Sequence, residues 1–118
     1  MCGEFYRGEI YYIMPGEAIG SEMYGGRPGI IVSNEMNNRY SPTVEVVYLT
    51  GKPKKPLPTH VRINSAKYPS TALCEQITTV AKERISSYVG KLSPEEEQAL
   101  NAALMVSIAL PLEPFWDF

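Results

Sequence analysis

The chain has 118 residues, of which 44% are hydrophobic and 20% charged, as in one soluble globular domain. We expect a single domain over residues 1–118. The formal net charge of −2 is unlike the strong positive charge of most duplex-binding proteins. No stretch approaches the ~18 consecutive apolar residues of a membrane span, and the N-terminus lacks the apolar core of a signal peptide. We therefore expect a cytoplasmic protein with no membrane segment.

Residues for acid–base and metal chemistry are scarce. His60 is the only histidine and Asp117 the only aspartate, and no G-x-S-x-G motif presents a serine. This excludes a paired-histidine ribonuclease within one chain and argues against a Ser-His-Asp triad. Cys2 and Cys74 lack metal-ligand spacing, so we expect reduced thiols, with Cys74 as a small buried hydrophobe. The glutamates show no ligand spacing either, and the sequence predicts no metal or other cofactor.

Basic side chains are concentrated in one short segment, which contains Lys52, Lys54, Lys55, His60 and Arg62. On charge alone we interpret this segment as a solvated loop. The clustering nevertheless leaves a nucleic-acid partner open in spite of the negative net charge.

Apolar segments of strand length dominate the chain as far as residue 92. A first strand ends at Pro15-Gly16, and a glycine-rich loop follows as far as Arg27. Turn signals at Asn37-Asn38 and Ser41-Pro42 precede an alternating strand that ends at Thr50, which shares a face with Val44, Val46 and Tyr48. The six expected strands are residues 8–14, 29–33, 43–50, 59–63, 72–80 and 85–92.

The C-terminal segment changes to a helical period. Ser93 is a natural N-cap, Pro94 suits the first helical position, and Glu96 completes a capping box. The helix should stop at Pro111, and its apolar stripe is Leu100, Ala103, Leu104, Ser107 and Ile108. Short strands followed by one amphipathic helix predict a small, strongly bent antiparallel β-barrel with the helix laid against it.

The stretch "GGRPGIIV" places a permanently charged side chain between a glycine-rich loop and a buried strand. Pro28 fixes its own φ and biases Arg27 to an extended backbone, so the guanidinium should project from the start of the strand. Its planar fork of donors suits a phosphate. From these residues alone, pairing with a surface glutamate is the preferred interpretation.

Six motifs occur in one order from Arg7 to Leu110: "YRGEIYYI", "GSEMYGGRPGIIVSN", "SPTVEVVYLT", "LPTHVRI", "ALCEQI" and "GKLSPEEEQALNAALMVSIAL". Together they resemble the MazF/PemK family of toxin–antitoxin endoribonucleases. The resemblance implies an SH3-like β-barrel with a C-terminal α-helix, working as a homodimer. That architecture agrees with the strands and helix expected above.

The resemblance also implies an activity. It is sequence-specific, metal-independent cleavage of single-stranded mRNA by a type II toxin. The RNA 2′-hydroxyl attacks its own phosphate and leaves a 2′,3′-cyclic phosphate and a 5′-hydroxyl. The implied partners are RNA, a cognate antitoxin and a second copy of the chain, with DNA reached only through the antitoxin.

Site residues follow from the same resemblance. Arg27 and Thr50 would be catalytic, stabilising the charge of the transition state, although Thr50 also reads as an ordinary strand threonine. The residues expected to bind or flank the substrate are Ser21, Glu22, Lys52, His60, Gln76 and Thr78. For Gln76, a buried amide bonded to backbone is an equally open interpretation, and for His60 we expect a structural or substrate-flanking role.

Some residues depart from the family pattern. Met23 stands where members often have glutamine, and Thr78 and Ala81 stand where many have arginine and aspartate. An aspartate base is therefore unavailable here, which keeps open a degenerate member that only binds RNA or antitoxin. The aromatic tail of residues 111–118 keeps open a CcdB-like toxin that binds gyrase, although covering the barrel or dimer seam is the favoured role.

Overall fold

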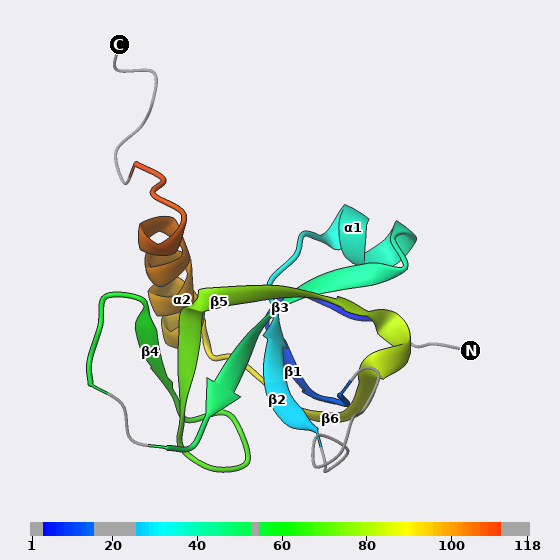
Figure 1. The fold of residues 1–118 in the computed structure, drawn as a ribbon, viewed down its shortest axis with the longest axis horizontal. Helices are drawn as coiled ribbons and strands as arrows, with labels where there is room; N and C mark the ends of the chain where they lie inside the picture. Colours follow the sequence, from blue (N-terminus) through cyan, green and yellow to red (C-terminus); the bar gives the residue numbers. More distant parts are fainter. Residues whose placement is uncertain (1–3, 16–25, 53–54, 112–118) are drawn as a thin grey trace.

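The computed structural model describes residues 4–15, 26–52 and 55–111 (Figure 1). The strands are β1 (Glu9–Ile13), β2 (Arg27–Ile31), β3 (Thr43–Thr50), β4 (His60–Ile63), β5 (Ser70–Ala81) and β6 (Ile85–Lys91). They form one antiparallel sheet in the order β4-β5-β3-β2-β1-β6. The helices are α1 (Glu35–Tyr40), the single 3₁₀ turn η2 (Lys82–Arg84) and α2 (Pro94–Ser107).

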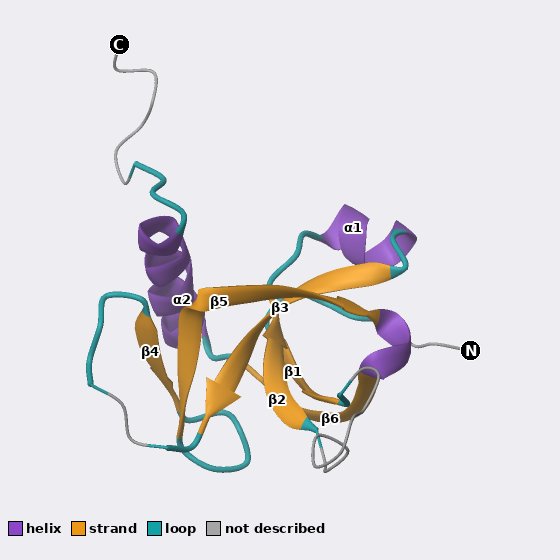
Figure 2. Cartoon of the chain, in the orientation of Figure 1, coloured by secondary structure: helices purple, strands orange, loops and turns teal. Residues whose placement is uncertain are grey.

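The expected fold class is confirmed. The sheet curls strongly, and α2 stands against the β4–β5 end (Figure 2). Within the described residues β4 and β6 remain edge strands, so the sheet is barrel-like without being closed. All six expected strands are present, and their ends match the expected ones or differ by at most two residues.

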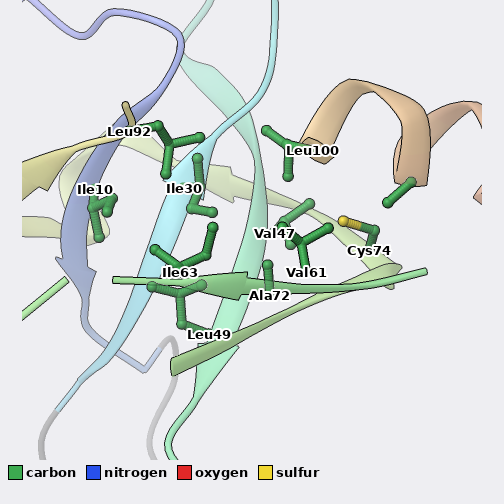
Figure 3. Packing of buried hydrophobic residues seen from close by; sticks show 11 residues of the cluster. Ile10, Ile30, Val47, Leu49, Val61, Ile63, Ala72, Cys74, Leu92 and Leu100 are labelled. Atoms are coloured by element: carbon green, nitrogen blue, oxygen red, sulfur yellow. The ribbon is translucent and has the colours of Figure 1, made fainter. Parts of the chain in front are cut away.

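The larger hydrophobic cluster lies on the face of the sheet that packs against α2, which we call the α2 face. Ile10, Ile30 and Val47 pair across β1, β2 and β3 and are fully buried there. Figure 3 shows their side chains in the same cluster as Leu100 of α2. Cys74 is buried in the same cluster, as expected, and burial raises the pKa of its thiol to about 12. A thiol held protonated in this way is inert.

A smaller cluster occupies the opposite face. Its buried members are Phe5, Ile13, Ile31, Val44, Val46 and Val80. Tyr48 packs against this cluster and is only half-buried. β3 is thus covered on both faces over most of its length. On the face of the smaller cluster its side chains become more exposed toward Thr50, from the buried Val44 and Val46 to the half-buried Tyr48 and Thr50.

The capping box of α2 is confirmed, with Ser93 accepting from the Glu96 backbone and Glu96 accepting from the Ser93 backbone. The expected end of the helix at Pro111 is wrong, because α2 stops at Ser107. Ala109 adopts φ 60°, and Leu110 N–H donates to the Met105 carbonyl at 2.8 Å. This is a Schellman closure, which turns the chain before the proline can.

Helix α1 was expected as a turn. Asn34 caps it by accepting from Asn37 N–H at 2.8 Å. Asn38 is buried and donates to the Ser33 carbonyl at 2.9 Å. The asparagines read as turn signals therefore serve as a cap and as a buried anchor for a short helix. No helix in the described ranges is both long and apolar enough to cross a membrane.

Candidate functional site

Arg27 is the first residue of β2, and its side chain is exposed. The expected projection from the start of the strand is confirmed. Its guanidinium carbon lies 4.4 Å from the centroid of the Tyr48 ring. An aromatic ring attracts the guanidinium through its face and leaves the N–H edges free. Among the described residues the Arg27 side chain forms no hydrogen bond or ion pair.

Thr50 is the last residue of β3 and is half-buried. Its Oγ1 accepts a hydrogen bond from Lys52 N–H at 3.2 Å. The accepted bond fixes the hydroxyl and leaves its proton available to an external oxygen. Lys52 itself is exposed, two residues beyond the end of the strand.

The strand register brings Arg27 and Thr50 together. Gly29 pairs with Tyr48, and continuing that antiparallel register by two residues places Arg27 opposite Thr50. Tyr48 is the diagonal neighbour, which explains its contact with the guanidinium. All three side chains emerge from the face opposite α2, because Ile30 and Val47 take the α2 face. This register places an arginine and a threonine opposite each other at the ends of two neighbouring strands.

His60, at the start of β4, is held through both ring nitrogens. Nε2 lies 3.1 Å from Glu75 Oε2, and Nδ1 lies 3.0 Å from the Lys55 carbonyl. Thr59 Oγ1 donates to the other Glu75 oxygen at 2.9 Å. Burial raises the pKa of Glu75, but hydrogen bonds from its own backbone, His60 and Thr59 outweigh it and hold the pKa below its ordinary value. These contacts support the expected structural or substrate-flanking role.

A break in the β3–β5 ladder places Gln76. Val47 pairs with Ile77 and Leu49 with Ala72, so residues 73–76 of β5 lie opposite Tyr48 alone. Gln76 is exposed by this irregularity, and the interpretation as a buried amide is wrong. Thr78 is half-buried, and its hydroxyl donates to the Gln76 carbonyl at 3.4 Å.

Gln76 borders a surface hollow of about 350 Å³, which is lined by Lys55, Leu57, His60, Leu73, Glu75 and Gln76. The lining combines two leucines with charged and polar side chains. A flat ring with hydrogen-bonding edges matches this combination, because its faces can pack on the leucines while the amide reads an edge.

Two of the expected substrate-binding residues, Ser21 and Glu22, lie outside the described residues, as do Met23 and residues 112–118 of the aromatic tail. The sequence analysis did not assign Tyr48 and Glu75 to the site. The Tyr48 ring contacts the Arg27 guanidinium, and the Glu75 carboxylate bonds the His60 ring. Strand alternation had placed Tyr48 on the face of Thr50, but nothing in the sequence paired it with Arg27. In the described ranges no group of three or more His, Cys, Asp or Glu side chains gathers as for a metal.

Known proteins are similar to this chain in sequence and in fold. The family model of PemK-like, MazF-like toxins of type II toxin–antitoxin systems matches residues 6–108. "Endoribonuclease EndoA" of Bacillus subtilis (strain 168) is 37% identical over 109 residues, covering 88% of this chain and 94% of that protein.

Solved structures agree. "Endoribonuclease from Mycobacterial species" superposes with a TM-score of 0.79 at 26% identity, covering 95% of this chain and 98% of that chain. "Endoribonuclease in complex with its cognate antitoxin from Mycobacterial species" gives a TM-score of 0.77 at 29% identity, covering 92% and 98%. With a family model matched over most of its length, this chain belongs to the PemK-like, MazF-like family of type II toxin–antitoxin toxins.

Proposed function

We propose that the chain is a sequence-specific, metal-independent endoribonuclease toxin that cuts single-stranded RNA by attack of the RNA 2′-hydroxyl on its own phosphate. Endoribonuclease activity is supported by family membership and by the relative from Bacillus subtilis. The observation that carries the site assignment is the β2–β3 register, which, continued by two residues, places Arg27 opposite Thr50 at the ends of the two strands.

Two donors of this kind suit phosphoryl chemistry. Arg27 presents a charged, planar fork to the phosphate, and the Thr50 hydroxyl donates to a phosphate oxygen whose charge grows in the transition state. The attacking hydroxyl is part of the substrate, so the protein need not supply the nucleophile. The bond from the 2′-oxygen to phosphorus forms as the bond to the 5′-oxygen breaks. The products are a 2′,3′-cyclic phosphate and a 5′-hydroxyl.

Substrate selection is assigned to the surroundings of this pair. Gln76 and the hollow beside it would take an unpaired base, with His60 held in its wall by Glu75. Lys52, whose backbone N–H bonds Thr50, would add positive charge near this end of β3, and Thr78 bonds the backbone of Gln76. Ser21 and Glu22 complete the proposed set. Bases must be unstacked to present their edges, so unpaired RNA is the substrate.

We infer a homodimer and an antitoxin partner in the cytoplasm. The last turn of α2 and the residues after it expose Met105, Val106, Ile108 and Leu110. Exposed apolar side chains of this kind mark a protein interface. The antitoxin is supported by a structural relative described as being in complex with its cognate antitoxin. Contact with DNA would be made by that antitoxin.

The reaction is tested with one RNA that the protein cleaves and a copy carrying a single 2′-deoxy sugar 5′ of the cleaved bond. The deoxy copy should bind and stay intact, whereas the parent should be cut equally well with and without EDTA. Cleavage of the deoxy copy would overturn the 2′-hydroxyl mechanism. Loss of activity in EDTA would overturn metal independence while leaving the endoribonuclease itself in place.

A further inference from the structure

Polar side chains form one row across four neighbouring strands. Arg62 of β4 pairs with Thr71 of β5, and Thr71 pairs with Thr50 of β3. Thr50 lies opposite Arg27 of β2 in the register given above. Figure 1 shows β4, β5, β3 and β2 side by side in this order. With neighbouring strands ~4.8 Å apart, this polar row spans ~14 Å.

All members of the polar row project from the same face of the sheet. A second row lies one residue away along the strands. It consists of the buried Leu49, Ala72 and Val61, in which Ala72 pairs with both of the others. Since successive side chains alternate between faces, the polar row projects away from the α2 face. Arg62 is exposed and Thr71 half-buried, so the far end of the row is open to a ligand.

We propose that Arg62 and Thr71 form a second phosphate subsite, which holds the RNA backbone one or more nucleotides away from the cleaved bond. The proposal rests on the proposed endoribonuclease function. The row has a guanidinium at each end, hydroxyls between them and no carboxylate. One small phosphate would need only one end. A strand with a charge at each nucleotide can use both ends at once.

The order of the strands favours RNA over another anionic partner. Thr50 and Thr71 are direct neighbours, so a ligand that lies on Arg62 and Thr71 continues without a gap into the candidate catalytic pair. A guanidinium also suits this task better than an ammonium group, because its fork bonds a phosphate through two donors. An acidic antitoxin segment on the same row is the competing occupant that the experiment has to separate.

The test is the salt dependence of binding to the cleavage-resistant deoxy RNA. Arg62→Gln should weaken binding and reduce the slope of log K against log salt by ~0.7, the value for one phosphate contact on a single strand. The matched control is Arg39→Gln, which makes the same charge change on α1. Arg39 precedes the start of β3, whereas Thr50 ends that strand. The control should leave the slope unchanged.

A second variant tests the contribution of the Thr71 hydroxyl to RNA binding. Thr71→Val keeps the β-branched shape of the strand and should weaken binding roughly 2- to 10-fold, the effect of one neutral hydrogen bond. The Arg62→Gln loss should persist with RNA shortened on one side of the cleaved bond and vanish with RNA shortened on the other. Thermal unfolding near that of the parent shows that both variants are folded.

The outcomes separate the two proposals. An unchanged salt slope for Arg62→Gln in a protein that still cuts RNA overturns the second subsite alone. Equal losses in the Arg62 and Arg39 variants also overturn it, since they would indicate a diffuse charge effect. Weakened antitoxin binding with unchanged RNA binding would assign the row to the antitoxin instead. A parent protein that neither binds nor cuts RNA would contradict the proposed function itself.

Discussion

Replacing Arg27 by alanine tests the core of the site assignment. The side chain is exposed at the start of β2, and its one described contact of note is the Tyr48 ring at 4.4 Å. A cation–π contact at such a site stabilises by ~0.5–1 kcal/mol, so Arg27→Ala should remain folded. Removal of one donor to a transition-state oxyanion costs ~2.7–4 kcal/mol, or ~10²–10³ in kcat.

The assay is single-turnover cleavage of an unpaired RNA oligonucleotide, run beside thermal unfolding of each variant. Arg27→Lys should recover little of the lost rate, because an ammonium group cannot reproduce the planar fork. Arg39→Ala on α1 is the matched control and should cleave at the parent rate. If Arg27→Ala cleaves within threefold of the parent while Arg39→Ala does the same, the assignment of Arg27 is refuted.

Two further predictions concern Tyr48, which contacts Arg27, and Glu96, which belongs to the capping box of α2. Tyr48→Leu should lower kcat/KM roughly 3- to 30-fold. Tyr48→Phe should keep the parent value, because phenylalanine retains the ring face under Arg27. In a double-mutant cycle, Tyr48→Leu should have no further effect in the Arg27→Ala background. Burial raises the pKa of Glu96, but hydrogen bonds from Ser65, Ser93 and Asn64 outweigh it and hold the pKa below its ordinary 4.5. Glu96→Gln should therefore lose ~1 kcal/mol of unfolding free energy at pH 7. This difference between parent and variant should disappear as the pH falls below about 4.5 and through the lower folded pKa, because the parent carboxylate then becomes protonated. A difference that persists at acid pH would show that the charge of Glu96 is not its cause.

Much of the fold could be predicted from local sequence patterns. The capping box at Ser93 and the alternation in residues 43–50 specify their elements through contacts a few residues apart. Helix α1 was missed because asparagine favours turns as well as caps, and only the fold shows Asn38 buried against Ser33. The end of α2 was misplaced because the closure uses alanine at the left-handed position, where glycine is the usual signal.

The site depended more on pairing between distant segments. Arg27 and Thr50 were assigned from a resemblance, and their proximity follows from the β2–β3 register, which no single segment encodes. Gln76 could not be placed from alternation, because residues 73–76 break the ladder opposite Tyr48 and shift the faces of β5. Arg62 was read with a solvated loop on charge alone, whereas β4 places it in line with Thr50.

The position of the site follows from how the core fixes the sheet. Leu49, Ala72 and Val61 are buried as partners across β3, β5 and β4, and a slip of one residue would carry them into solvent. The polar row is their neighbour along each strand, so the hydrophobic effect that fixes the buried row also fixes the spacing of the exposed one. Exposed donors gain little from one another energetically. Their alignment is therefore a consequence of core packing, which leaves the side chains themselves free to serve a phosphate backbone.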